Sequence, residues 1–142
     1  MGDRISEAAV GTATIGVRVP AEPEHLIMLR ALAETVTLIA DFAIDEVTDI
    51  RLALDEVATA LIMDAVPDSS LDCEFRYADN QMFVHVAAVA AVPSSVGEGS
   101  FGWHIVRTLT DSVTVTQEPY DGAVSGYPTV VDFLWVRASD DG

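Results

Sequence analysis

Two stretches of the chain carry residue types that could do chemistry. The first is Leu-Ala-Leu-Asp-Glu-Val-Ala-Thr at residues 52–59, in which Glu56 lies within a pattern typical of a helix. A carboxylate beside a hydrophobic core is either a working acid or base or the ordinary polar flank of an amphipathic helix. The second is Gly-Glu-Gly-Ser-Phe-Gly-Trp-His-Ile-Val at residues 97–106, a glycine-rich turn that opens a short helix. Such turns expose backbone N–H groups, where anions bind.

The helix that positions Glu56 is expected to cover most of residues 45–65. Apolar residues recur there at gaps of three and four, which places one stripe on a core. The stripe consists of Val47, Ile50, Leu54, Val57, Leu61 and Ala65. A second facet consists of Ala53, Glu56, Ala60 and Asp64. Asp45 is the candidate N-cap, and Pro67 stops the helix shortly after its end.

The remaining elements are expected on both sides of this helix. In chain order they are a strand at 12–20, a helix from Pro23–Glu24 to about Phe42, strands at 71–78 and 81–92, a helix from 99 or 100 to 109, a strand at 112–116, a long loop at 117–128 and a strand at 129–137. This order predicts a two-layer α/β (α+β) sandwich, a mixed sheet with helices on one face. We expect one domain at 12–137, a mobile N-terminus at 1–11 and a frayed tail at 138–142.

Charge is the most extreme bulk property of the chain. Seven Lys and Arg against 23 Asp and Glu give a net charge of −16. Nucleic acid would be repelled, so we expect no direct DNA or RNA binding. An acidic surface suits a basic protein partner, although solubility alone would explain it equally well. No apolar run approaches the roughly 18 residues that span a bilayer. Residues 1–11 do not resemble a signal peptide. We therefore expect a cytoplasmic location.

The single cysteine and the three histidines indicate packing more than chemistry. Cys73 has no partner for an internal disulfide and lies on the apolar side of its predicted strand. His85, in the strand at 81–92, is expected to be packed or hydrogen-bonded. Scattered histidines and one cysteine form no metal-ligand cluster, so no metal site is predicted.

The Glu56 helix, the glycine turn and the following Asp111-Ser112-Val113, in this order, resemble the Bergerat-type (GHKL) ATPase fold. More narrowly, the chain resembles RsbW-type anti-sigma factors over residues 12–137, and Ser-Phe-Gly-Trp-His at 100–104 looks most like the actinobacterial members. Intact members are serine-protein kinases. The resemblance implies a residual catalytic base at Glu56, a residual nucleotide turn at Gly99, Ser100 and Gly102, and partner contacts at Arg30 and Glu24. Arg30 falls where the family carries an arginine that contacts the sigma factor, but a solvated surface arginine explains it equally well.

The chain departs from the kinase pattern at three places. Where the family has a magnesium-binding asparagine four residues after the glutamate, this chain has Ala60, which cannot coordinate metal. The Asp-x-Gly box that reads adenine is absent from residues 87–93, which read Ala-Ala-Val-Ala-Ala-Val-Pro. The segment between Val92 and Gly97 is far too short for the family's ATP lid. These departures predict a degenerate kinase with no certain cofactor and, at most, weak binding of ATP and magnesium.

Three functions remain open at this point. The resemblance favours an anti-sigma factor that sequesters an alternative sigma factor of the stress or sporulation type, is released by a STAS-type anti-anti-sigma antagonist, and forms a homodimer. The first alternative is an active ATP-dependent kinase that phosphorylates that antagonist. The second is an acidic α/β domain with a non-sigma partner, because a fold does not fix a function. The first helix and the loop at 117–128 are the candidate contact surfaces.

Overall fold

The computed structural model describes residues 13–93 and 101–137. In chain order the elements are β1 (Ala13–Pro20), the short 3-10 helix η1 (Pro23–His25), α2 (Leu26–Ile39), α3 (Ile44–Met63), β2 (Ser70–Ala78), β3 (Gln81–Ala90), α4 (Phe101–Leu109), β4 (Ser112–Gln117) and β5 (Tyr127–Val136). The expectations for residues 1–12, 94–100 and 138–142, including both terminal segments, the shortened lid, Gly99 and Ser100, lie outside the described residues.

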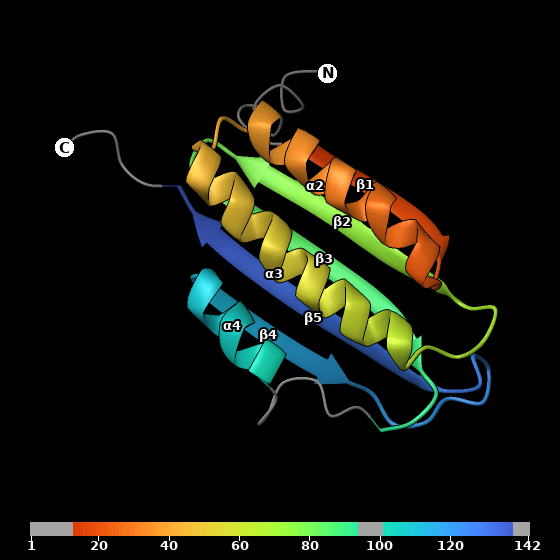
Figure 1. Cartoon of the computed structure of the whole chain (residues 1–142). Coiled ribbons are helices and arrows are strands. Elements are labelled where there is room, and N and C mark those ends of the chain that lie inside the picture. The colour runs from red at the N-terminus through yellow and green to blue at the C-terminus, as the bar shows by residue number, and fades with distance from the viewer. Residues whose placement is uncertain (1–12, 94–100, 138–142) are drawn as a thin grey trace, which may run out of the picture.

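The sheet has five strands in the order β1-β2-β3-β5-β4 (Figure 1). Every neighbouring pair is antiparallel, which corrects the expectation of a mixed sheet. The reason lies in β5, which inserts between β3 and β4. Those two strands run in the same direction across the α4 connection, but they are not neighbours. β3 takes the central position of the sheet.

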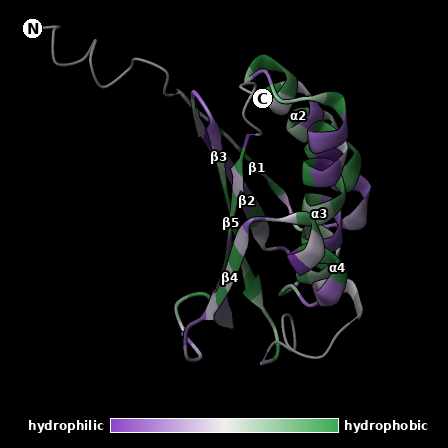
Figure 2. Ribbon diagram, turned by 90° about the vertical axis from the view of Figure 1, so that its left-hand side faces the viewer, coloured by the Kyte–Doolittle hydropathy of each residue, from purple (hydrophilic) through white to green (hydrophobic). Residues whose placement is uncertain are grey.

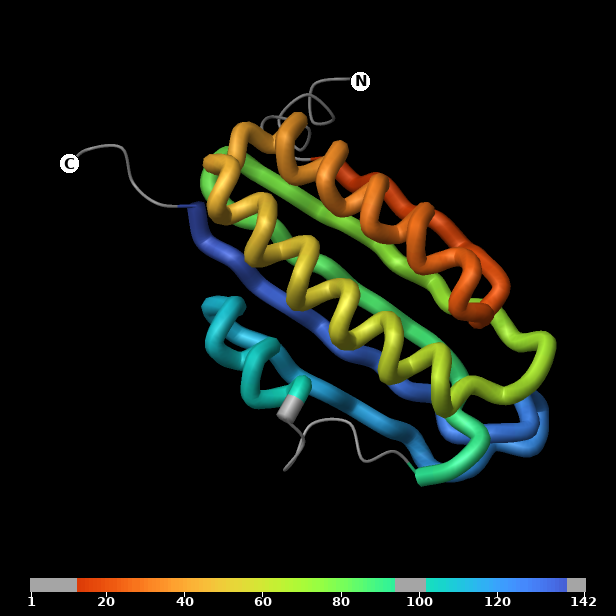
Figure 3. Tube along the Cα trace, viewed as in Figure 1, coloured from red at the N-terminus to blue at the C-terminus, as the bar shows by residue number. Residues whose placement is uncertain are grey.

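The three α-helices cover one face of the sheet and leave the other open, so the predicted two-layer sandwich is confirmed (Figure 2). α3 lies in the middle of the helical layer, with α2 on one side and α4 on the other (Figure 3). Five residues of its predicted stripe are buried, namely Val47, Ile50, Leu54, Val57 and Leu61. Ala53, which we expected on the second facet, is also fully buried, so the buried surface of α3 is wider than one stripe. None of the helices in the described residues has the length and apolar character needed to cross a bilayer.

The ends of α2 and α3 differ from their expected positions. α2 ends at Ile39 instead of near Phe42, because Asp41 adopts a left-handed backbone conformation with φ 69° that no helix continues through. Ala43, not Asp45, is the N-cap of α3. The Glu46 carboxylate accepts a 2.8 Å hydrogen bond from the Ala43 N–H, which is the acidic half of a capping box.

Cys73 is a packing residue, as expected. Its side chain is 1% exposed on β2 and belongs to the core between sheet and helices. Burial disfavours the thiolate and raises the pKa of the Cys73 thiol from 9.0 to about 12.

The connection from β4 to β5 is a structured turn, shorter than the loop predicted at 117–128. The Asp121 and Gly126 backbones pair across it, with a 2.8 Å hydrogen bond from the Asp121 N–H to the Gly126 carbonyl. Gly126 is buried, and a Cβ there would stand 2.5 Å from the Ala90 carbonyl oxygen and 2.8 Å from Val66 Cγ2. Only glycine allows this turn to pack so closely against the ends of β3 and α3.

Candidate functional site

The acidic motif of α3 faces both neighbouring helices. Asp55 contacts α2 through Arg30, and the next residue, Glu56, lies beside α4 at Gly102. Successive residues on a helix project about 100° apart, so two adjacent carboxylates can contact two different neighbouring helices. The motif that carries the family resemblance therefore contacts both helices that flank α3.

The contact to α2 is an ion pair. The Arg30 Nε donates a 2.7 Å hydrogen bond to Asp55 Oδ1, and the two side chains are 43% and 32% exposed. Arg30 is thus neither fully solvated nor buried: Asp55 orients its guanidinium while part of it stays open to solvent. A charge-assisted hydrogen bond of this kind restricts the orientation of an arginine side chain more than a hydrogen bond to a neutral acceptor would.

The contact to α4 is a close approach of carboxylate to backbone. Glu56 is exposed, but its carboxylate lies so near Gly102 that a Cβ at position 102 would overlap it. Gly102 is the second residue of α4 and part of the predicted nucleotide turn. The structure therefore brings together two of the predicted site residues, Glu56 and Gly102, although they are far apart in the sequence.

Backbone pairing joins the end of β3 to the end of α3. Its two hydrogen bonds run from the Val66 N–H to the Val89 carbonyl at 2.9 Å and from the Ala91 N–H to the Asp64 carbonyl at 2.7 Å. Ala60 lies one turn before this junction, on the side of α3 that also carries Glu56. Alanine side chains at 60, 87, 88, 90 and 91 offer neither metal ligand nor adenine acceptor.

Glu24 lies away from Glu56, on the η1 turn that precedes α2. It is exposed, and it neighbours the Glu22 carboxylate and the His25 ring. Arg30 follows on α2 itself, so the two predicted partner-binding residues share one end of the helical layer.

An acidic hollow, which sequence reasoning missed, lies at the other end of the α3–α4 pair. It encloses about 200 Å³, and its walls include three carboxylates, Glu46, Asp49 and Asp111, above the aromatic rings of Phe42 and Trp135. The Trp135 Nε1 donates a 2.8 Å hydrogen bond to the Leu109 carbonyl, and Asp111 Oδ2 accepts one of 2.7 Å from the Val136 N–H. No sequence signal marks the hollow, because its residues come from three separate stretches of the chain, 42–49, 108–111 and 135–136.

The open face of the sheet carries His85. Its Nδ1 lies 2.7 Å from Asp132 Oδ1 on the neighbouring strand β5, directly opposite in the register. The expectation of a hydrogen-bonded histidine is confirmed. The pairing itself was not foreseeable, because it depends on β5 lying next to β3.

Fold and site together are consistent with the GHKL-like class: an α+β sandwich with an acidic motif on its central helix and a glycine at the start of the helix beside it. No family model matches the chain. Two curated relatives match it, the "Anti-sigma-F factor RsbW" proteins of two Mycobacterium tuberculosis strains, CDC 1551 / Oshkosh and H37Rv. Each is 33% identical over 116 residues, which cover 82% of this chain and 69% of the relative. The chain belongs to the RsbW family of anti-sigma factors.

Proposed function

We propose that this protein binds an alternative sigma factor and keeps it from RNA polymerase. The observation that carries the proposal is the match to anti-sigma-F factors across most of the chain. The charge is in keeping with it. A sigma factor must contact DNA and therefore has basic surface, and a protein of net charge −16 is suited to cover such a surface.

The contact surface we propose is the outer side of α2 with the η1 turn before it. Ile27 and Met28 are 70% and 51% exposed there, and such large apolar side chains are typical of the buried centre of an interface. Arg30 lies two residues further on, held by Asp55 with part of its guanidinium open to solvent. Glu24 supplies an exposed carboxylate at the same end. The surface thus combines apolar anchors with two oriented charges.

We propose that release of the sigma factor is regulated as in other RsbW-type proteins. A STAS-type anti-anti-sigma protein competes for the chain and releases the sigma factor, and the working form is a cytoplasmic homodimer that contacts neither nucleic acid nor membrane. The sigma factor would belong to the stress or sporulation type.

We further propose that kinase activity is lost. Ala60 cannot hold magnesium, which bridges phosphate oxygens and neutralises developing charge in phosphoryl transfer. The paired ends of α3 and β3 occupy the region of the missing Asp-x-Gly box. One observation favours the second candidate, an active serine-protein kinase: Glu56 still lies against Gly102, so a base and part of a nucleotide turn remain together.

Calorimetry with purified sigma-F of Mycobacterium tuberculosis tests the proposed binding. We expect a tight complex, and we expect Arg30→Ala to weaken it about tenfold or more, a loss typical of an interface arginine. Arg76→Ala is the matched control, because Arg76 is a solvent-exposed arginine on β2, away from α2. Equal affinity for Arg30→Ala and Arg76→Ala would rule out the α2 surface. Absence of binding to sigma-F and to the other alternative sigma factors of the cell would favour a non-sigma partner.

Calorimetry with magnesium-ATP, before and after addition of sigma-F, separates sequestration from catalysis. A pure sequestering protein gives no heat with the nucleotide. A micromolar dissociation constant would overturn the proposed loss of the pocket and make Glu56→Gln, assayed by phosphate transfer to the antagonist, the next experiment.

A further inference from the structure

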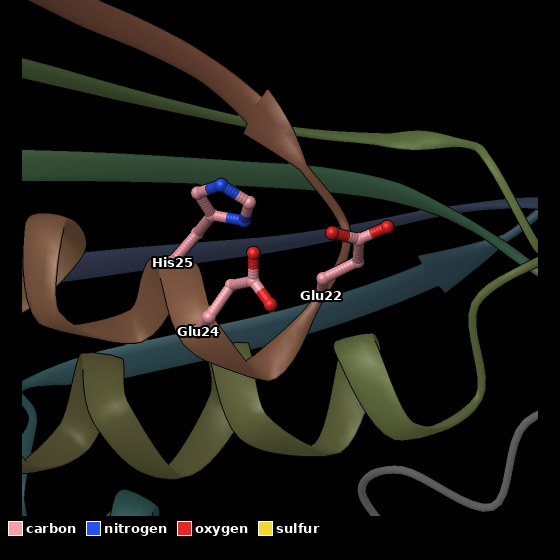
Figure 4. Close-up of side chains that lie close together, drawn as sticks. All are labelled: Glu22, Glu24 and His25. Carbon is pink, nitrogen blue, oxygen red and sulfur yellow. The ribbon is translucent and has the colours of Figure 1, made fainter.

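Three potential metal ligands meet in the short turn between β1 and α2. One ligand atom from each of Glu22, Glu24 and His25 lies within 4.8 Å of the other two. Figure 4 shows the three side chains on the same part of the turn, with the His25 ring beside the Glu24 carboxylate. Two carboxylate oxygens and an imidazole nitrogen are a donor set that borderline divalent ions accept.

Two hydrogen bonds order the backbone of this turn, one to the segment before β2 and one within the turn. The Ala21 N–H donates a 2.9 Å hydrogen bond to the Ser69 carbonyl, and the His25 N–H donates one of 3.0 Å to the Glu22 carbonyl. Pro23 stands between the two glutamates and restricts the backbone further. With the backbone ordered in this way, side-chain rotations are enough to bring the three ligand atoms, which already lie within 4.8 Å of one another, to a common centre.

The imidazole ring of His25 has a nitrogen without a hydrogen-bond partner among the described residues. This atom, the Nδ1, is buried. A buried polar nitrogen without a partner loses its hydration and gains no hydrogen bond in exchange, so such atoms call for a ligand or an explanation. The neighbouring helix start does not need the ring, because the residue caps nothing with its side chain.

We propose that Glu22, Glu24 and His25 bind a divalent transition-metal ion, with Zn²⁺ as the best-suited ion and water in the remaining position. Ligands around a tetrahedral Zn²⁺ at about 2.1 Å stand about 3.4 Å apart, so side chains already within 4.8 Å need only small rotations. The ion takes the unpartnered His25 Nδ1 as a ligand and neutralises two adjacent carboxylates. The search of the sequence for clustered histidines and cysteines did not find this site, because two of its three ligands are glutamates. These glutamates stand at the start of a helix, where acidic residues are common for other reasons.

The site adds a property beyond sigma-factor binding. It lies directly before α2, so the ion would brace the start of the helix that carries Ile27, Met28 and Arg30. Metal occupancy and partner binding can nevertheless be measured separately, since the first needs no sigma factor.

Titration of the full chain with Zn²⁺ at pH 7.5, followed by calorimetry, tests the proposal. We expect one site per chain with a micromolar dissociation constant, weakened about tenfold or more in both His25→Gln and Glu24→Gln. Glu24 is exposed, so the second variant keeps the test valid even where the first affects folding. His85→Gln is the matched control. His85 also lies beside a carboxylate, that of Asp132, but among the described residues it belongs to no group of three possible metal ligands.

Absorption of Co²⁺ gives a second readout. A His25-dependent d–d spectrum that Zn²⁺ displaces would support the site. Equal loss of binding in His25→Gln and His85→Gln would show diffuse association with the acidic surface and overturn the proposal. No heat with Zn²⁺ up to millimolar concentration would also overturn it, while leaving the sigma-factor result untouched.

Discussion

The ion pair between α2 and α3 supports a quantitative prediction. Arg30 Nε and Asp55 Oδ1 are 2.7 Å apart, and the side chains are 43% and 32% exposed. Two unit charges about 4 Å apart interact by roughly 1 kcal/mol in water and about 4 kcal/mol near a protein surface. Desolvation, side-chain entropy and solvent screening offset most of this for partly exposed pairs. We therefore expect a net coupling of about 0.5–1 kcal/mol in the free energy of unfolding.

A double-mutant cycle measures that coupling. Urea denaturation of the parent chain, Arg30→Ala, Asp55→Ala and the double variant gives four unfolding free energies, and their combination isolates the pair. The same cycle on Arg18 and Asp72 is the matched control, since that pair is as short at 2.6 Å but its side chains are 72% and 45% exposed. The control coupling should be the smaller one.

Two results would refute this reasoning. A coupling within about 0.2 kcal/mol of zero would mean that Asp55 does not hold Arg30 in solution. A coupling for Arg18 and Asp72 as large as that for Arg30 and Asp55 would mean that exposure does not control the strength of these pairs.

Three further predictions concern packing, ionisation and the incomplete pocket. Gly126→Ala should destabilise the fold by about 1–3 kcal/mol, because the added Cβ would overlap the Ala90 carbonyl. Gly122→Ala is the control and should be nearly neutral, because a Cβ there would meet nothing within 4 Å. Equal melting temperatures of the two variants in thermal unfolding would contradict the overlap. The raised pKa of Cys73 favours the protonated thiol in the folded state, so its contribution to stability is complete below pH 9.0 and is lost as the pH rises toward about 12, by up to about 1.4 kcal/mol per pH unit. That loss should be missing from the pH–stability profile of Cys73→Ala, and matching profiles would disprove it. Ala60→Asn should raise the affinity for magnesium-ATP by restoring a ligand on the side of Glu56; an unchanged affinity in calorimetry would refute our account of position 60.

Local patterns were enough to predict most elements. The three-and-four spacing along α3 identified its buried stripe, and the alternation around Cys73 placed the thiol in the core, because each signal arises from the geometry of a single helix or strand. The motif around Glu56 also pointed to the family that the Mycobacterium tuberculosis relatives define. Arg30 and Glu24 as partner contacts, and Gly99 and Ser100 as a nucleotide turn, remain predictions.

Only the tertiary structure decided which residues meet. The insertion of β5 between β3 and β4 made every neighbouring pair antiparallel and set Asp132 opposite His85. Packing of the helices placed Asp55 beside Arg30 and Glu56 beside Gly102. It also formed the acidic hollow from three separate stretches of the chain. Sequence periodicity reports which side of one element is apolar, but the choice of neighbour depends on how the whole chain buries those sides together, which no single stretch contains.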